Sequence, residues 1–227
     1  MNQRAGTPGA PTLLVSEIFH SIQGESTWAG LPMVFVRLAG CPLHCTYCDT
    51  RYAQEEGRSM GLEEVLGRVE SYRYPLVEVT GGEPLAQGAC PELLRRLCEA
   101  GKTVLLETSG AYSLAQVDRR VCVILDIKTP GSGQAEHCRW ENLEWLRPER
   151  DEIKFVVTGR EDYQWAREQI AARELARRAK AVLFSPAFGQ VESAALAQWI
   201  LDDRLPPPVR LQLQIHKHIW PDQPRGR

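Results

Sequence analysis

The sequence predicts an α/β fold, in the form of a partial, shortened (β/α) barrel. Short apolar, β-branched runs alternate along the chain with segments of helical periodicity, which is the pattern of βαβ units. Several runs are apolar without interruption, as in Val121–Leu125, and such runs indicate strands buried on both faces of a parallel sheet. The chain has 227 residues, whereas a complete eight-fold barrel usually needs about 250.

The apolar runs and the helical patterns give the expected elements in order. Strands are expected at Leu13–Ile18, Met33–Leu38, Leu76–Thr80, Thr103–Glu107, Val121–Ile127, Glu152–Val157, Ala181–Phe184 and Arg210–Ile215. Helices are expected at Gly61–Tyr72, Pro91–Ala100, Leu114–Arg119, Asp162–Arg178 and Ser193–Asp202. Ligands of such folds gather at the carboxyl ends of the strands, so the residues just after each strand are the first candidates for a site.

The composition is that of an ordinary globular domain. Hydrophobic residues make up 43% of the chain and charged residues 25%, which is close to the average. The formal net charge is −2, so no overall basic field favours a nucleic acid as partner. No apolar run reaches the roughly 18–20 residues that a membrane span needs. We therefore expect neither a nucleic acid nor a membrane as partner.

Both ends of the chain are expected to lie outside the folded domain. Residues 1–12 are rich in Gly, Pro and Ala and lack the apolar stretch of a secretory signal, so they are interpreted as a flexible leader. A single domain is expected over residues 13–220, with a C-terminal tail at 221–227. Seven cysteines without an export signal favour a reducing compartment, and we expect a cytoplasmic protein.

Three cysteines follow the second expected strand directly. Cys41, Cys45 and Cys48 have the spacing Cys-x3-Cys-x2-Cys, and so compact a loop can wrap its thiolates around one metal centre. With no fourth cysteine nearby, an iron–sulfur cluster would keep one iron open to another ligand. The alternative is a zinc site completed by a residue such as His44 or His20, in a non-catalytic metal-binding protein.

The other four cysteines lie in different contexts. Cys90, Cys98 and Cys122 occupy apolar or helical segments and are expected to be buried small residues. Cys138 lies in a polar stretch and has no predicted role.

The cysteine pattern in this strand–loop context resembles that of the radical S-adenosylmethionine (SAM) superfamily. The resemblance implies a partial barrel of the radical SAM type, with a [4Fe–4S] cluster on the three cysteines. It implies that the open iron chelates the amino and carboxylate groups of SAM, whose reductive cleavage yields a 5′-deoxyadenosyl radical. It also implies SAM contacts from Tyr47, Cys48 and Asp49.

A glycine pair ends the third expected strand, in the segment Thr80-Gly81-Gly82-Glu83-Pro84. Paired glycines permit positive φ and a close approach of the backbone to a ligand. A lone pair would be interpreted as a simple turn. This segment lies about 30 residues after the cysteines, and with that position it resembles the second motif of the superfamily. The resemblance implies that Gly82 and Glu83 receive the SAM amino group.

Two further strand ends carry polar residues. Ser109 follows the fourth expected strand, and Lys128 follows the strongly apolar fifth. Charged residues at such borders are often solvated loop residues. Because both segments should point into the mouth of the barrel, SAM binding by Ser109 and Lys128 is the preferred prediction.

Arg37 lies on the second expected strand, four residues before Cys41. An arginine at this place is costly to bury without an anionic partner, and its planar fork suits a carboxylate. The partner is either a substrate carboxylate or a structural acid, such as Glu17 or Glu107.

Three segments narrow the resemblance further: Glu17–Glu25, Phe35–Cys41 and Leu211–Lys217. The runs Ile22–Glu25, Phe35–Cys41 and Cys48–Thr50 carry most of it. With them the chain from Glu17 to Trp220 closely resembles the 7-carboxy-7-deazaguanine synthase family. That family converts 6-carboxy-5,6,7,8-tetrahydropterin to 7-carboxy-7-deazaguanine with loss of ammonia, an early step toward queuosine and other deazapurines. The reaction is a radical ring contraction, in which the hydrogen taken from C6 is later returned.

This family resemblance implies roles for single residues. Arg37 would pair with the C6 carboxylate of the pterin, and Thr50 would offer its hydroxyl to Mg²⁺. A single neutral oxygen is a weak anchor for this ion, which we expect to bind well only with substrate present. The remaining implied substrate contacts are Ile22, Gln23, Gly24, Thr80 and, from the last expected strand, His216, with Gln214 as a further candidate.

The same resemblance implies partners. A flavodoxin-like reductant and a homodimer are expected, and the C-terminal tail is a candidate to reach the substrate. The nearest alternative is a glycyl-radical-enzyme activase, which has the same cysteine spacing but acts on a protein backbone. Arg37 together with Gln23–Glu25 favours a small-molecule pocket over that alternative.

Overall fold

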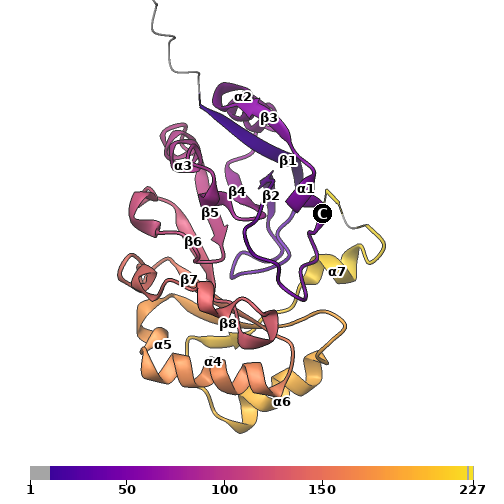
Figure 1. Cartoon of the computed structure of the whole chain (residues 1–227), viewed down its shortest axis with the longest axis vertical. Coiled ribbons are helices and arrows are strands. Elements are labelled where there is room, and N and C mark those ends of the chain that lie inside the picture. Colours follow the sequence, from indigo (N-terminus) through magenta and orange to yellow (C-terminus); the bar gives the residue numbers. More distant parts are fainter. Residues whose placement is uncertain (1–10, 224, 227) are drawn as a thin grey trace, which may run out of the picture.

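The computed structural model describes residues 11–223, 225 and 226, and one curved sheet runs through this part of the chain (Figure 1). The strand order is β3-β1-β2-β4-β5-β6-β7-β8-β9. The strands are β1 (Thr12–Ile22), β2 (Pro32–Leu38), β3 (Arg58–Gly61), β4 (Leu76–Gly81), β5 (Thr103–Thr108), β6 (Cys122–Asp126), β7 (Glu152–Val157), β8 (Ala181–Pro186) and β9 (Val209–Leu211).

The helices lie between these strands, except for α7, which follows β9. They are α1 (Tyr52–Glu55), α2 (Leu62–Ser71), α3 (Cys90–Glu99), α4 (Arg160–Ala172), α5 (Leu175–Arg178), α6 (Ser193–Asp202) and α7 (Ile215–Ile219). The pairs from β2 to β9 are parallel, whereas β1 is antiparallel to both β2 and β3. The sheet ends at β3 and β9, so the barrel is open and the predicted α/β partial barrel is confirmed.

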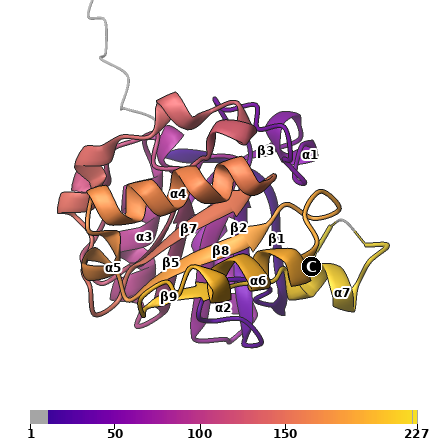
Figure 2. The ribbon, with the colours of Figure 1, turned by 90° about the horizontal axis from the view of Figure 1, so that it is seen from below.

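Residues of the parallel strands alternate between two environments. The outward side chains, such as Val77, Val79 and Leu106, join the main apolar core with residues of α2, α3, α4 and α6. The inward side chains toward the amino ends of the strands form a second, smaller cluster: Met33, Phe35, Leu105, Cys122 and Ile124. Figure 2 shows α4 and α6 along the outer side of the sheet, where this main core lies.

Polar residues occupy the same inward face farther along each strand. Thr80 follows Glu78 by two residues on β4, and Asp126 follows Ile124 by two on β6. Since side chains two residues apart point to the same side of a strand, these polar groups line the barrel interior above the small apolar cluster. The carboxyl ends of the strands therefore carry a polar layer.

The last part of the chain differs from the expected strand Arg210–Ile215. β9 ends at Leu211 and Ile215 begins α7, so that prediction is wrong for residues 212–215. His216, which was expected to act from this last strand, lies in α7. The backbone N–H of Ile215 donates to the carbonyl of Gly24 at 3.0 Å. Tertiary contact with the loop after β1 thus overrides the alternation that favoured a strand.

Two expected helices also differ. The segment Leu114–Arg119 forms only a 3₁₀ turn at Leu114–Gln116, because Asp118 accepts a hydrogen bond from the Arg120 N–H and forms a turn of its own. The segment Asp162–Arg178 is divided between α4 and α5, with Glu174 at a positive φ of 52° between them.

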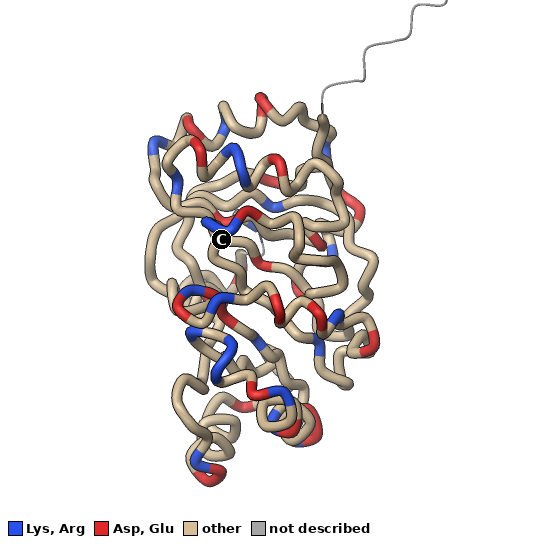
Figure 3. The backbone as a smooth tube through the Cα atoms, turned by 90° about the vertical axis from the view of Figure 1, so that its left-hand side faces the viewer, with Lys and Arg blue, Asp and Glu red and all other residues tan. Residues whose placement is uncertain are grey.

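The first strand is longer than expected, and β3 was not predicted at all. Most of the expected leader, residues 1–10, lies outside the described residues, but Thr12 is the first residue of β1. Acidic and basic residues are interspersed along the chain in Figure 3. Within the described ranges, no helix combines the length and apolar character needed to cross a membrane.

Candidate active site

A cavity of about 580 Å³ lies over the polar ends of the parallel strands. Its walls come from the strand ends, the cysteine loop after β2, the loop after β1 and α7 with the segment that follows. Of the residues predicted for a site, those that line it are Ile22, Gln23, Gly24, Arg37, Cys41, Cys45, Tyr47, Cys48, Asp49, Thr50, Thr80, Gly82, Ser109, Lys128 and His216. The cavity therefore brings together every candidate except Glu83.

The cysteine loop is fixed against neighbouring segments. The Gly40 N–H donates to the Ala53 carbonyl at 2.8 Å, and the Thr46 hydroxyl donates to the Gly131 carbonyl at 2.8 Å. Cys41 and Cys45 have raised pKa values because burial disfavours the thiolate. A bound cation would reverse this effect, as it does for coordinating thiols in general.

The three thiols meet the main requirement of a cluster site. All seven cysteines are free, and Cys41, Cys45 and Cys48 line the same cavity. Among the described residues, no three His, Cys, Asp or Glu side chains are arranged around a single metal ion. A [4Fe–4S] cluster with one open iron takes three thiolates, and three cysteines of one loop on a single cavity suit that donor set.

Two unpaired polar atoms point to a ligand beside the thiols. Tyr47 Oη and Asp126 Oδ1 are buried without a hydrogen-bond partner among the described residues, and both residues line the cavity. Buried polar atoms are nearly always satisfied in folded proteins. A polar ligand such as SAM would supply the missing partners.

The glycine pair after β4 has a packing role. Gly81 has a φ of 135°, and a Cβ there would lie 2.1 Å from the Leu38 carbonyl oxygen. A Cβ on Gly82 would lie 2.0 Å from the Gly40 carbonyl oxygen. The two glycines thus allow a close approach between two backbone segments of the chain, whereas the sequence predicted a close approach of the backbone to a ligand. It brings the end of β4 against the start of the cysteine loop.

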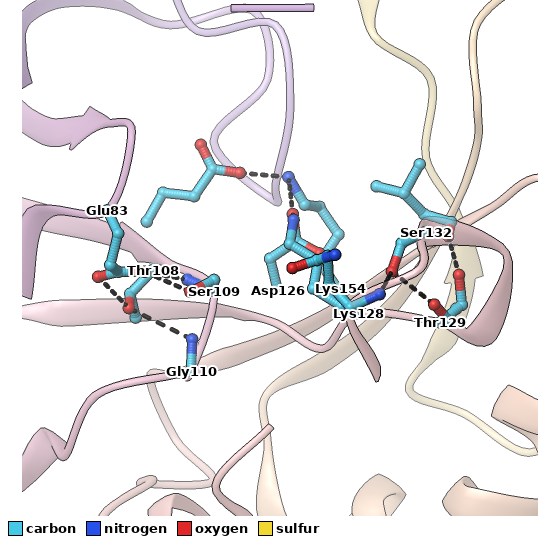
Figure 4. A network of polar contacts seen from close by, with 12 residues as sticks. Glu83, Thr108, Ser109, Gly110, Asp126, Lys128, Thr129, Ser132 and Lys154 are labelled. Atoms are coloured by element: carbon cyan, nitrogen blue, oxygen red, sulfur yellow. Dashed lines mark hydrogen bonds and ion pairs between the residues drawn. The ribbon is translucent and has the colours of Figure 1, made fainter. Parts of the chain in front are cut away.

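Glu83 lies beneath the cavity and is fully buried. Its Oε1 accepts from the Thr108 hydroxyl at 2.8 Å, and its Oε2 accepts from the Ser109 N–H at 2.7 Å and from the Ser109 hydroxyl (Figure 4). The Leu85 N–H also donates to Oε1. Glu83 therefore holds Ser109 in place, and its direct contact with SAM stays a prediction.

Lys128 forms a charged group with the strand ends of β6 and β7. Its Nζ lies 2.9 Å from Asp126 Oδ2 and 5.8 Å from the centre of the Tyr47 ring. Burial opposes its charge, but Asp126 outweighs burial and raises the pKa of Lys128. Figure 4 shows Asp126, Lys128 and Lys154 close together.

Lys154, which sequence reasoning missed, balances several buried acids. Its side chain is 5% exposed, and its Nζ lies 2.8 Å from Glu25 and 3.2 Å from Asp126, and also contacts Glu107. Burial opposes the charge on Lys154, but these acids raise its pKa. The sequence did contain an indication that Lys154 faces the barrel interior, because Glu152 and Lys154 alternate with apolar residues on β7 and so share the inward face.

Gln23 and Glu78 form a second buried pair that faces the cavity. Gln23 Nε2 donates to Glu78 Oε2, and Gln23 Oε1 accepts from the Glu25 N–H at 2.9 Å. Burial, with the nearby charges of Glu107 and Glu25, raises the pKa of Glu78 well above its usual range. The Gln23 side chain thus fixes the loop that carries Glu25.

Arg37 has a structural acid as its partner, one of the two alternatives that the sequence left open. Its Nε lies 2.8 Å from Glu17 Oε1, which also accepts from the Tyr52 hydroxyl at 2.7 Å. Within the described part of the chain, this is the only ion pair of Arg37. Arg37 lines the cavity and its side chain is 14% exposed, so the terminal nitrogens, which have no ion-pair partner among the described residues, can meet a ligand.

Comparison with known proteins agrees with this geometry. Residues 35–126 match the radical SAM superfamily. A protein of Chlorobaculum tepidum named 7-carboxy-7-deazaguanine synthase is 50% identical to this chain, over 94% of this chain and 97% of that protein. A protein of the same name from Koribacter versatilis is 42% identical, over 93% of this chain and 99% of that protein. The chain belongs to the 7-carboxy-7-deazaguanine synthase family.

A solved structure extends the comparison to the fold of this family. The crystal structure of QueE from Escherichia coli has a TM-score of 0.73 and 23% identity, and the match covers 89% of this chain and 93% of that one. The fold of this family member is therefore that of a radical SAM protein, as the sequence predicted. Its membership also makes a [4Fe–4S] cluster and SAM the expected cofactors.

The C-terminal tail of this family member returns to the site. The Gly226 N–H donates to Glu17 Oε2 at 3.0 Å, and Arg225 pairs with Glu56 at 2.8 Å. Pro221 and Gln223 line the cavity. Figure 1 shows the described end of the chain beside α1. The described part of the tail therefore packs beside the Arg37–Glu17 pair.

Gly24 and His216 meet at the opposite side of the cavity. A Cβ on Gly24 would lie 1.9 Å from His216 Nδ1, so only glycine lets α7 pack this closely. Burial lowers the pKa of His216 and favours a neutral imidazole at neutral pH. The sequence named both residues but placed His216 on a strand.

Thr50 offers little to a divalent cation. Its hydroxyl donates to Asp49 Oδ1 at 2.8 Å, while Asp49 Oδ2 lies 2.6 Å from Lys217 Nζ. Mg²⁺ prefers octahedral oxygen coordination, whereas the groups here are one hydroxyl and a carboxylate already paired with an ammonium. The residues around Thr50 do not fit Mg²⁺.

Proposed function

We propose that the protein is a 7-carboxy-7-deazaguanine synthase, a radical SAM lyase. It would convert 6-carboxy-5,6,7,8-tetrahydropterin to 7-carboxy-7-deazaguanine and ammonia, in the biosynthesis of queuosine and other deazapurines. The observation that carries the proposal is that three thiols and Arg37 line one cavity. A small carboxylated substrate held by Arg37 would then lie in the same space as the cofactors of the cysteine loop.

The cofactors would occupy the side of the cavity nearest β6. Cys41, Cys45 and Cys48 would hold the [4Fe–4S] cluster. Once bound and reduced by one electron, the cluster would cleave SAM and so supply a 5′-deoxyadenosyl radical, the species that would take hydrogen from the substrate. The proposed SAM contacts are Tyr47, Cys48, Asp49, Gly82, Glu83, Ser109 and Lys128.

Arg37 would orient the substrate. Glu17 holds Nε at 2.8 Å, and the terminal nitrogens of the guanidinium would then face the C6 carboxylate. A planar fork binds a carboxylate through two parallel hydrogen bonds. Such a contact fixes the position of C6, from which hydrogen is taken.

The acids around Lys154 would bind the opposite edge of the pterin. The pyrimidine ring of a pterin carries N–H donors, and ionised carboxylates accept them strongly. Lys154 holds Glu25 and Glu107 in place, and Thr80 donates to Glu107 at 3.1 Å. Burial opposes ionisation of Glu25, but Lys154 lowers its pKa and keeps it an acceptor. Ile22, Gln23, Gly24 and His216 would complete the pocket.

The proposal extends to partners and location. A flavodoxin-like protein would deliver the electron that SAM cleavage requires. A homodimer would cover the open sheet edges at β3 and β9, because unpaired edges are prone to further strand pairing. A cytoplasmic location is consistent with seven free cysteines.

The proposal is tested with the cluster-loaded protein under anaerobic conditions. SAM, a chemical reductant and 6-carboxytetrahydropterin are added, and 7-carboxy-7-deazaguanine is measured by mass. We expect product from the wild type and none from Cys45→Ala, which should also lose iron. Cys138→Ala is the matched control, because Cys138 does not line the cavity. This variant should keep both product formation and the bound iron.

The same assay separates the alternative. SAM cleavage without this product would contradict the deazaguanine assignment and favour the glycyl-radical-enzyme activase. Full iron loading in Cys45→Ala would contradict the assignment of the cluster ligands.

A further inference from the structure

Lys217 connects α7 with the end of the cysteine loop. Its Nζ lies 2.6 Å from Asp49 Oδ2, while the hydroxyl of Thr50 donates to the other oxygen of the same carboxylate at 2.8 Å. All three residues line the cavity, and the Lys217 side chain is 19% exposed. One carboxylate thus joins a fixed ammonium to the hydroxyl of Thr50.

A second contact holds the ammonium at this place. Lys217 Nζ lies 5.2 Å from the centre of the Phe188 ring, and His218 packs edge-on to that ring at 6.0 Å. A cation over an aromatic face is attracted by the negative charge of the ring face. The Lys217 charge is therefore positioned from two sides, by Asp49 and by Phe188.

Lys217 and a divalent ion would compete for the same place. A metal on the Thr50 hydroxyl would have the Asp49 carboxylate as an adjacent oxygen ligand, but that carboxylate is paired with Lys217. Two cations close to one carboxylate repel each other strongly in a partly buried site. A bound metal would therefore have to displace the ammonium.

We propose that Lys217 is the built-in cation of this active site and takes the place of a magnesium ion. Its ammonium would donate hydrogen bonds to the substrate oxygens beside Thr50 and neutralise their negative charge. This inference rests on the proposed function, since it concerns binding of the carboxylated substrate. The enzyme would then bind divalent ions weakly and turn over without them.

Metal binding gives a test that does not depend on turnover. The cluster-loaded enzyme is mixed with SAM and 6-carboxytetrahydropterin but no reductant, and titrated with Mn²⁺ while free Mn²⁺ is followed by electron paramagnetic resonance. We expect Lys217→Met to bind Mn²⁺ at least tenfold more tightly than the wild type, and Thr50→Val in that background to remove the gain. Lys217→Gln serves as a second variant should Lys217→Met fold poorly.

Product formation in a chelator gives a second readout. We expect the wild type to keep its rate in EDTA, whereas Lys217→Met should lose at least tenfold in EDTA and recover with Mg²⁺. Lys102→Met is the matched control, because Lys102 pairs with Glu70 outside the cavity, and it should behave as the wild type in both assays.

The outcomes distinguish this inference from the proposed function. Equal Mn²⁺ affinities in the wild type, Lys217→Met and Lys217→Gln would overturn the role of Lys217 even if the product forms. A wild-type rate that is lost in EDTA and restored by Mg²⁺ would overturn it as well. Tighter Mn²⁺ binding by Lys217→Met without product from any variant would support the cation site and contradict the proposed reaction.

Discussion

The two faces of the parallel strands differ sharply in what they bury. On β5, Leu106 points outward into the main apolar core and is fully buried, whereas its neighbour Glu107 points into the cavity and pairs with Lys154. Burial of the outward face drives folding. Buried ion pairs add little stability, because desolvation offsets their attraction. The inward charges are therefore explained by ligand binding rather than by folding.

This contrast predicts that the two faces respond differently to substitution. A change on the outward face should lower stability with little effect on the folded enzyme. A change in the polar layer of the inward face should lower activity, and should lower stability only where it leaves a buried charge without its partner.

The largest effect is expected for Lys154→Met. It leaves Glu25, Glu107 and Asp126 without their shared cation, and loss of one partner from a buried pair costs about 3–5 kcal/mol of unfolding free energy. Activity should be lost with it. Urea unfolding checks the stability, and Lys102→Met is the control.

A second variant sharpens this prediction. Adding Glu107→Gln to Lys154→Met should restore part of the lost stability but not the activity, because one unbalanced charge is removed. Equal stability of the single and the double variant would show that the inward charges are not coupled.

The next effect concerns substrate binding by the inward face. Arg37→Met should lower kcat/KM by about 10- to 150-fold, which corresponds to the roughly 1.5–3 kcal/mol of a charge-assisted hydrogen bond. Steady-state kinetics measures it, with Arg95→Met, on the exposed face of α3, as the control. Arg37→Lys should not restore the rate, since an ammonium lacks the fork. A rate equal to the wild type would remove Arg37 from the substrate site.

The smallest effect, taken over a single pH unit, is a pH dependence of stability. Burial raises the pKa of Glu78 well above its usual range, so the folded chain keeps a proton there that the unfolded chain loses. Stability from this group is complete below the ordinary carboxyl pKa and declines as pH rises toward the raised pKa, by at most about 1.4 kcal/mol per pH unit. Glu78→Gln should remove this decline, as measured by urea unfolding from pH 4 to 8. An unchanged slope would show that Glu78 is ionised in the folded state.

The sequence was most informative where function depends on local spacing. The cysteine loop, the glycine pair and Arg37 are short motifs at strand ends, and all of them line or border the cavity. The alternating polar pattern of residues 211–216 misled, because α7 is fixed by contact with Gly24 rather than by local propensity.

The charged layer could not be predicted from local pattern alone. Glu25, Glu78 and Glu107 each look like an ordinary polar residue in the sequence, and the alternation that places Lys154 on the inward face does not identify its partners. Whether these side chains meet in the cavity depends on the register of neighbouring strands and on the loop after β1, which no local pattern determines. Lys217 likewise gains its role only when α7 packs beside the cysteine loop.

The most direct test compares Leu106→Ala with Glu107→Gln, neighbours on opposite faces of β5. Stability is measured by urea unfolding and kcat/KM on the folded fraction. Leu106→Ala should cost about 2–5 kcal/mol and leave kcat/KM unchanged. Glu107→Gln should cost less stability but lower kcat/KM at least tenfold, about 1.4 kcal/mol. A full rate in Glu107→Gln, or a lost rate in folded Leu106→Ala, would contradict the division of roles between the two faces.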